Sequence, residues 1–161
     1  MRRTYFWAIV LAVVLRAGVA QAAPKAEVFG GYQFTHLDGG PNLNGWNAAL
    51  TGYLNSFLGI TADLTGVYGS GLSFHTYTFG PEVAVHLPLV KPFAHVLVGG
   101  ARASAGGVSS NGFDVYFGGG ADVGHGLLAW RIAQFDWMVT RFSGFTDRKN
   151  VRFSTGLVLR F

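Results

Sequence analysis

The 161-residue sequence contains no cysteine, few charged residues and a single long apolar run. Without cysteine there is neither a disulfide framework nor a thiolate metal site. Only 12% of the residues are charged although 50% are hydrophobic, a balance that is unusual for a water-soluble domain. Outside the amino-terminal region, no segment reaches the roughly 20 apolar residues of a membrane-spanning helix. Sparse charge without a helical span points to β-structure.

The apolar run lies at the amino terminus. Two arginines precede it, it covers about residues 5–15, and a small-x-small pattern with Ala20 and Ala22 follows. This order is that of a secretory signal peptide, and the run is too short for the alternative, an amino-terminal membrane anchor. We therefore expect residues 1–22 to be removed and residues 23–161 to form a single domain.

Removal of the signal peptide changes the charge balance of the chain. The sequence has 12 Lys and Arg against 8 Asp and Glu, and three of the arginines lie in the first 22 residues, which leaves nine cations against eight anions. No segment of the mature chain carries the clustered basic face that nucleic-acid binding needs. The sequence therefore predicts no nucleic-acid partner.

The last twelve residues alternate strictly between two kinds of side chain. One face carries apolar residues and a threonine, whereas the other carries two arginines and mostly small residues. The first face consists of Val151, Phe153, Thr155, Leu157, Leu159 and Phe161, and the second of Arg152, Ser154, Gly156, Val158 and Arg160. Period-two alternation predicts a β-strand. A strand with lipid on one face and a polar interior on the other belongs to a closed barrel in a bilayer.

Seven further alternating segments, separated by turn signals, precede this one. With the final strand they are expected at about residues 25–36, 46–55, 58–68, 74–86, 92–104, 112–123, 127–142 and 150–161. Ten residues at about 3.3 Å each, tilted by about 40°, cover roughly the 25 Å apolar band of such barrels. The predicted fold class is therefore all-β, an eight-stranded antiparallel up-and-down transmembrane β-barrel.

Two of the predicted strands contain irregularities. Pro81 lacks an N–H group inside a strand that has no free edge, so we expect a β-bulge there. In the seventh strand Arg131 is out of step with Gln134, which predicts a second bulge.

Eight charged residues fall on the faces that we assign to the interior. They form a balanced set of four acids and four bases: Glu27, Asp63, Glu82, Asp122, Arg102, Arg131, Arg152 and Arg160. Because the interior of an eight-stranded barrel is just filled by side chains, we expect these residues to form ion pairs that plug it. A narrow conducting path remains the alternative.

The assignment of faces in the fifth strand follows hydrophobicity. It puts Phe93, Leu97 and Ala101 on the lipid side, together with His95, and it puts Arg102 on the interior side.

Candidate catalytic and metal-binding patterns are absent from the sequence. The five histidines, His36, His75, His86, His95 and His125, form no close ligand pair. Lipid-modifying barrel enzymes place a serine two residues after a histidine, and no histidine here has one. We therefore expect no metal, no cofactor and no enzymatic activity.

Four stretches along the chain resemble the small eight-stranded OmpA-like outer-membrane barrel family of Gram-negative bacteria. These are the opening residues 27–32, the residues 92–95, the glycine run 118–122 and the closing residues 152–161. The resemblance implies an outer-membrane location, membrane lipids as partners, and contacts with assembly machinery and periplasmic chaperones in transit. It covers the barrel alone, so we expect no peptidoglycan-binding domain, and we expect a monomer.

The carboxy-terminal aromatic residue resembles the signal by which outer-membrane barrels are recognised for assembly. The candidate signal residues are Phe153, Leu157, Leu159 and Phe161.

The sequence favours a structural or surface-interaction role in the outer membrane. Two alternatives stay open at this point: a narrow outer-membrane pore, and a soluble exported carrier of lipocalin type. In the carrier the apolar faces would point inward and the charged faces outward.

Overall fold

The computed structural model describes residues 24–142 and 145–161 and contains eight β-strands. They are β1 (Ala26–His36), β2 (Asn42–Tyr53), β3 (Leu58–Gly69), β4 (Leu72–Ala84), β5 (Val90–Ala105), β6 (Val108–His125), β7 (Leu128–Phe142) and β8 (Phe145–Arg160). The predicted cleavage residues Ala20 and Ala22 lie outside the described residues. Within the described residues, no helix is long and apolar enough to span a bilayer.

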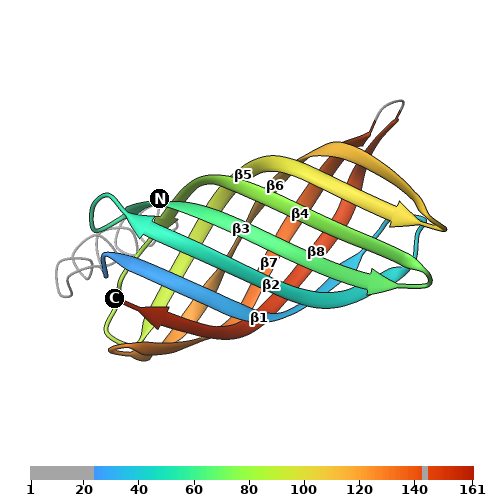
Figure 1. Cartoon of the computed structure of the whole chain (residues 1–161). Helices are drawn as coiled ribbons and strands as arrows, with labels where there is room; N and C mark the ends of the chain where they lie inside the picture. Colours follow the sequence, from blue (N-terminus) through green and yellow to red (C-terminus); the bar gives the residue numbers. More distant parts are fainter. Residues whose placement is uncertain (1–23, 143–144) are drawn as a thin grey trace, which may run out of the picture.

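The strands form one closed antiparallel barrel in which each strand pairs with its neighbour in the sequence (Figure 1). Closure is made by β1 and β8, which pair from Glu27 opposite Arg160 to His36 opposite Val151. Because every strand has a partner on each side, the backbone amides along the wall are hydrogen-bonded within the sheet, as a lipid environment requires. The predicted fold class is confirmed.

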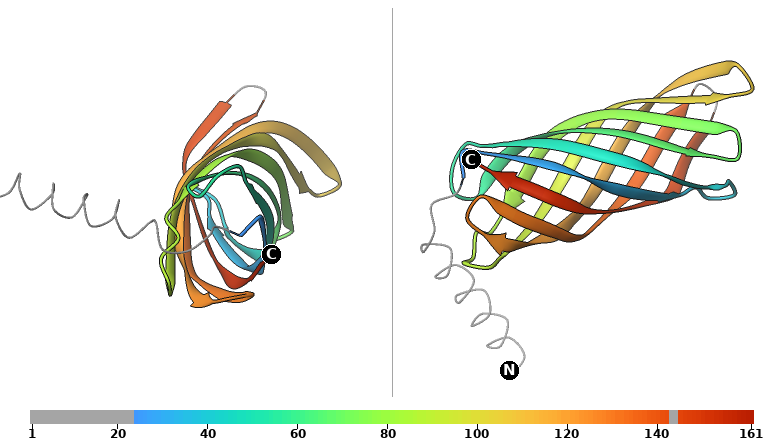
Figure 2. Two further views of the ribbon diagram at one scale, coloured as in Figure 1. Left: turned by 90° about the vertical axis from the view of Figure 1, so that its left-hand side faces the viewer. Right: turned by 60° about the horizontal axis from the view of Figure 1, so that its bottom comes forward.

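The two ends of the barrel differ. The terminal end is the one where β1 begins and β8 ends, and it also carries the connections 54–57, 85–89 and 126–127. The distal end carries the other four connections. There β5 and β6 are the longest pair, and their hairpin projects beyond the neighbouring strands (Figure 2).

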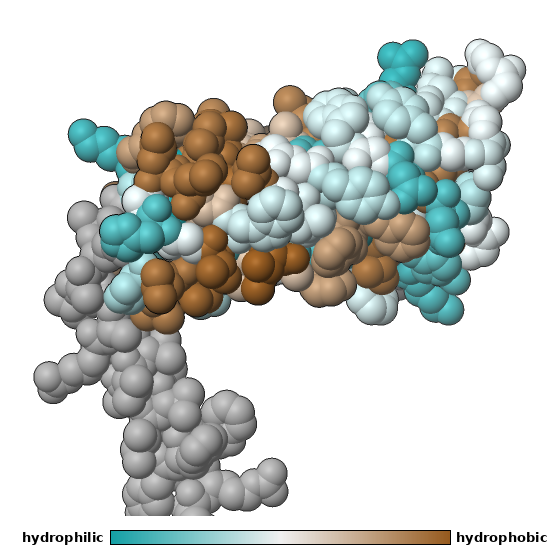
Figure 3. Space-filling view, turned by 90° about the horizontal axis from the view of Figure 1, so that it is seen from below, coloured by the Kyte–Doolittle hydropathy of each residue, from teal (hydrophilic) through white to brown (hydrophobic). Residues whose placement is uncertain are grey.

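Side chains alternate between the wall and the interior as the final strand predicts. On β8, Leu157 and Leu159 are 48% and 41% exposed on the outside, whereas Arg152 on the same strand is fully buried inside. Large apolar side chains cover the outside of the other strands too, among them Leu50, Ile60, Leu64, Phe79, Phe117 and Phe135. On the face shown in Figure 3, hydrophobic residues gather over the part of the wall nearer the terminal end, and the distal end is more polar.

One predicted bulge is confirmed and the other is wrong. The pairing of β7 with β8 shifts between Arg131 and Gln134. At Pro81 there is no shift, because Phe79 opposite Val98 and Glu82 opposite His95 keep one register on both sides of it. The ladder to β5 is interrupted there without an extra residue, so the missing N–H does not displace the strand.

The predicted strand bounds leave residues 105–111 and 143–149 as connections, yet most of the described residues in both segments belong to strands. β5 runs to Ala105 and β6 begins at Val108, so only two residues connect them. Residues 105–111 are exposed on both faces of this hairpin, so their polarity does not oppose strand formation.

Candidate functional site in the barrel interior

The centre of the interior is a row of five residues, one on each of five adjacent strands. Cross-strand pairing places Glu82, His95, Gly118, Asp136 and Arg152 side by side on β4 to β8. Gly118 contributes no side chain, so His95 Nε2 reaches across it to Asp136 Oδ1 at 2.6 Å. A Cβ atom at Gly118 would lie only 1.9 Å from that carboxylate oxygen. The glycine is therefore required for this contact.

Arg152 connects this row to the opposite wall. Its Nε donates to Asp136 Oδ2 at 2.7 Å, and its Nη1 and Nη2 donate to Asp63 at 2.7 and 3.3 Å. Its guanidinium carbon also lies 4.5 Å from the centre of the Tyr116 ring. Since β8 and β3 are not neighbours, the bond to Asp63 crosses the lumen and closes it.

A second charged group lies closer to the terminal end, around the buried Lys91. Its Nζ forms an ion pair with Glu27, lies 3.1 Å from Asp122 Oδ2 and 3.7 Å from Glu82 Oε1, and donates to Tyr53 Oη at 3.0 Å. Three carboxylates surround one ammonium group, so the surplus negative charge must be met by other cations.

Two arginines supply that positive charge. Arg131 Nε donates to Asp122 Oδ1 at 2.7 Å, and its guanidinium carbon lies 4.4 Å and 4.2 Å from the ring centres of Phe29 and Phe93. Arg160 Nε donates to Glu27 Oε1 at 3.1 Å. Each interior cation is thus bound to at least one carboxylate, which is what offsets the large desolvation cost of buried charge.

The distal half of the interior contains a cluster of apolar side chains beside buried polar residues such as Thr76, Asp114 and Thr140. The cluster consists of Leu43, Val67, Phe74, Leu97, Ala101, Tyr116 and Met138. Tyr116 carries the only hydroxyl of the cluster, and it donates to Thr76 Oγ1 at 2.9 Å. The interior is thus blocked by packed hydrocarbon distally and by ion pairs centrally.

The predicted charge set is largely brought together. The structure places these seven members inside the barrel: Glu27, Asp63, Glu82, Asp122, Arg131, Arg152 and, partly exposed at the terminal end, Arg160. Arg102 is the exception. It is exposed on the outside, where Nη2 contacts Ser109 Oγ at 3.5 Å.

The error at Arg102 comes from an inverted face assignment for β5. Phe93, Leu97 and Ala101 point inward, with exposures of 6%, 0% and 1%, and His95 points inward with them. Hydrophobicity misled because the distal interior is itself apolar, so both faces of β5 are hydrophobic. The inversion removes Arg102 from the interior and brings in Lys91, which the predicted set lacked.

Lys91, His95, Asp114 and Asp136 are the interior ionisable residues that the predicted set omitted. Asp114 accepts a hydrogen bond from Thr140 Oγ1 at 2.9 Å. Strict two-residue steps from Asp122 to Asp114 and from Gln134 to Asp136 were the available signals for the aspartates. Among the described residues, no group of His, Asp and Glu side chains is arranged to hold a metal ion.

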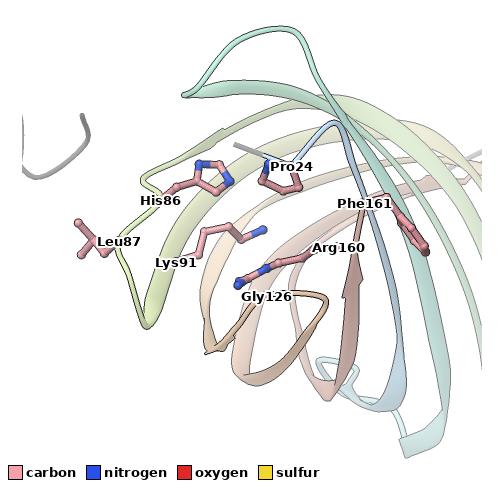
Figure 4. Close-up of a pocket in the computed structure, with 7 residues that line it drawn as sticks. All are labelled: Pro24, His86, Leu87, Lys91, Gly126, Arg160 and Phe161. Atoms are coloured by element: carbon pink, nitrogen blue, oxygen red, sulfur yellow. The ribbon is translucent and has the colours of Figure 1, made fainter. Parts of the chain in front are cut away.

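A pocket of about 210 Å³ opens at the terminal end (Figure 4). It is lined by Pro24, His86, Leu87, Lys91, Gly126, Arg160 and Phe161. Lys91 and Arg160 point into it, and both bind Glu27, so the pocket ends at the charged plug. The His86 ring contacts the Ser56 carbonyl oxygen through Nδ1 at 3.1 Å. Burial, reinforced by the charge of Lys91, lowers the pKa of His86.

No family model matches the sequence, and no curated protein sequence matches it either. Neisserial surface protein A matches with a TM-score of 0.62 at 14% identity, over 84% of this chain and 96% of that one. The N-terminal β-barrel domain of Pseudomonas aeruginosa OprF matches with a TM-score of 0.58 at 10% identity, over 88% and 100%.

The attachment invasion locus protein Ail of Yersinia pestis also matches, with a TM-score of 0.55 at 16% identity over 86% and 99% of the two chains. The fold is that of the small outer-membrane β-barrels. At these identities the likeness establishes the fold alone.

Proposed function

We propose that this protein is an integral outer-membrane β-barrel with a structural or surface-interaction role and no catalytic activity. The observation that carries the proposal is the opposition of its two faces. The outside is apolar along the strands, as shown by Leu64 and Phe79 at 53% and 62% exposure, while Asp63 and Arg152 form an ion pair inside. Such a wall is stable only where hydrocarbon replaces water.

The filled interior argues against a pore. The Arg152–Asp63 bridge spans the lumen, and the apolar cluster around Leu97 and Tyr116 lies distal to it. Passage of an ion would require both layers to open, and opening the first would leave buried charges without partners.

The soluble carrier is disfavoured by the same orientation. A lipocalin-type barrel holds its ligand against inward-facing apolar residues. Here the leucines of β8 point outward, and the inner side of the same strand presents Arg152 and Ser154.

A surface-interaction role would fall to the distal end. The β5–β6 hairpin continues above the apolar wall and exposes Val108, Ser109, Ser110 and Asn111. Ail, one of the structural neighbours, is named as an attachment invasion locus protein and has been solved with a heparin analogue, sucrose octasulfate. This likeness supports testing the distal hairpins as the interacting part.

Envelope fractionation combined with gel mobility tests the membrane assignment. The protein should be found in the outer-membrane fraction, and the unheated, detergent-solubilised barrel should migrate faster than the boiled protein because it stays compact. Recovery in the aqueous periplasmic fraction would refute the proposal in favour of the carrier.

Planar bilayers test the sealed interior. The purified protein should give no stable conductance steps, since the ion pairs and the apolar cluster both block the lumen. Regular steps in the wild-type protein would establish the pore instead.

The proposed assembly signal is tested by truncation of its last side chain. Phe153, Leu157 and Leu159 lie on the outward side of β8, and Phe161, which follows β8, is 63% exposed. Phe161→Ala should lower the amount of folded barrel in the outer membrane. Leu54→Ala, a matched change of an exposed apolar residue elsewhere at the terminal end, should not. Equal yields of the two variants would contradict the assignment.

A further inference from the structure

The exposed charges of the strands are unevenly distributed. Among the strand residues whose side chains the structure describes, the exposed charged residues are Arg102, Arg141 and Lys149. All three are cationic, and all three lie near the distal end, on β5, β7 and β8. The acidic strand residues described in the structure are buried. Among the described strand residues, the most exposed positive charges therefore lie at the distal rim.

Lys149 differs from the two arginines because it has a carboxylate partner, Asp38, at 3.8 Å. Neither Arg102 nor Arg141 forms an ion pair with a described carboxylate. Arg102 contacts only a hydroxyl, that of Ser109, at 3.5 Å. These two guanidinium groups keep most of their donors available to a ligand.

Cross-strand pairing brings the two arginines onto one patch. Arg102 stands opposite His75 of β4 and opposite Asn111 of β6. Arg141 stands opposite Phe113, which follows Asn111 by two residues on β6. The two arginines thus flank β6, and the exposed Phe113 ring lies between them. We call His75, Arg102, Asn111, Phe113 and Arg141 the distal patch.

Below the distal patch the wall is apolar and aromatic. The Tyr77 ring lies over Gly100, where an added Cβ would come within 2.3 Å of Tyr77 Cζ. Phe79, Val96 and Phe117 follow further down, with exposures of 62%, 41% and 50%. Cationic donors above and hydrocarbon below match a molecule with an anionic headgroup and acyl chains.

Guanidinium groups favour phosphate because their paired N–H groups match two phosphate oxygens. We propose that the distal patch binds the phosphate group of an anionic lipid in the surrounding leaflet, with Arg102 and Arg141 as the donors. The acyl chains of that lipid then lie along Phe113 and Tyr77. This inference rests on the proposed membrane location, because only a membrane-embedded wall meets lipid at this height.

The test compares two lipids that differ in headgroup charge. The barrel is refolded in maltoside micelles, and dioleoylphosphatidic acid or zwitterionic dioleoylphosphatidylcholine is added, with bound lipid counted by native mass spectrometry. The wild-type protein should prefer phosphatidic acid. The double variant Arg102→Gln/Arg141→Gln should bind it about tenfold more weakly, because charge-assisted hydrogen bonds are lost.

Lys25→Gln is the matched control, since it removes an exposed positive charge at the terminal end. It should leave the preference unchanged. Equal binding of the two lipids by the wild-type protein, or a double variant that binds as the wild type does, would overturn the inference. Gel mobility separates this failure from that of the proposed function. A barrel that is heat-modifiable and fractionates with the outer membrane but lacks lipid preference refutes only the distal patch.

Discussion

The two halves of the barrel interior are filled in different ways. Towards the terminal end and the centre, cations and carboxylates neutralise one another around Lys91 and Arg152. Towards the distal end, Leu97, Tyr116 and Met138 pack as in an ordinary hydrophobic core. The outside of the barrel has to be apolar, whereas the inside can be filled either by neutralising ion pairs or by packed apolar side chains.

The two kinds of interior packing respond differently to single substitutions. Removal of one partner from a buried ion pair leaves the other charge uncompensated, while shortening an apolar side chain leaves a cavity. The charged half should therefore be the more sensitive to single substitutions, and the predictions below probe that difference.

The largest effect is expected at the centre of the charged half. Arg152→Met leaves Asp63 and Asp136 without their cation, and it should lower the free energy of unfolding by about 3–5 kcal/mol, measured by urea titration in lipid vesicles. The exposed Arg102→Met is the control and should cost less than about 0.5 kcal/mol. Similar losses at both arginines would remove the distinction between the interior and the wall.

The apolar half should show a loss of intermediate size. Leu97→Ala opens a cavity beside Tyr116 and Met138, for which about 3 kcal/mol is expected in the same titration. Its neighbour Val96 faces outward, so Val96→Ala should cost only about 1 kcal/mol. If Val96 proved the more costly of the two, the inward assignment of the β5 hydrophobic face would be wrong.

Gly118 tests how the central row is packed. Gly118→Ala drives a methyl group towards Asp136 and should cost about 1–3 kcal/mol while disturbing the contact between His95 and Asp136, visible in the imidazole NMR signals. Gly30 on the outer face of β1 has no atom within 4 Å of an added Cβ, so Gly30→Ala should be nearly neutral. An unchanged His95 signal in the Gly118 variant would contradict the packing.

The smallest effect concerns pH at the terminal end. Burial lowers the pKa of His86, so the unfolded chain binds a proton more readily than the folded barrel does. Stability should therefore fall as the pH drops below about 6.5, the ordinary histidine value, and be recovered above it. Groups facing His86 include Tyr53, Lys91, Glu27 and Arg160. His86→Gln should show a shallower acid loss than the wild type, and parallel curves would exclude this residue as the cause.

The alternation of β8 was sufficient to predict the strand and its division into a leucine face and an arginine face. Which of these faces points outward followed only from preferring the membrane barrel to the soluble carrier, in which the two faces are reversed. β5 shows the opposite case. Its inner face mixes Lys91 and His95 with apolar residues, and its outer face mixes apolar residues with Arg102, so polarity did not distinguish the two faces. Which face points inward depended on packing against Tyr116 and Met138, which the local sequence does not encode.

Pro81 illustrates a second limit. A missing N–H was taken to require an extra residue, yet β4 and β5 tolerate a local gap in the ladder, with Gly80 approaching the Val96 carbonyl closely. The loss of one backbone hydrogen bond does not by itself predict whether the strand forms a bulge or keeps its register with a gap in the ladder. In β7, by contrast, Arg131, Gln134 and Asp136 all had to point inward, and only a bulge satisfies all three.

The seam between β1 and β8 joins the two ends of the sequence, so its contacts have the longest loop to close. The pair of Glu27 and Arg160 can take its place in a closed barrel only when all the intervening strands have been synthesised and paired. Until then the incomplete sheet has two exposed edge strands, and each of them can pair with a strand of another chain. Closure of the β1–β8 seam is therefore expected late in folding, and until it forms, pairing of these two strands with other chains competes with it.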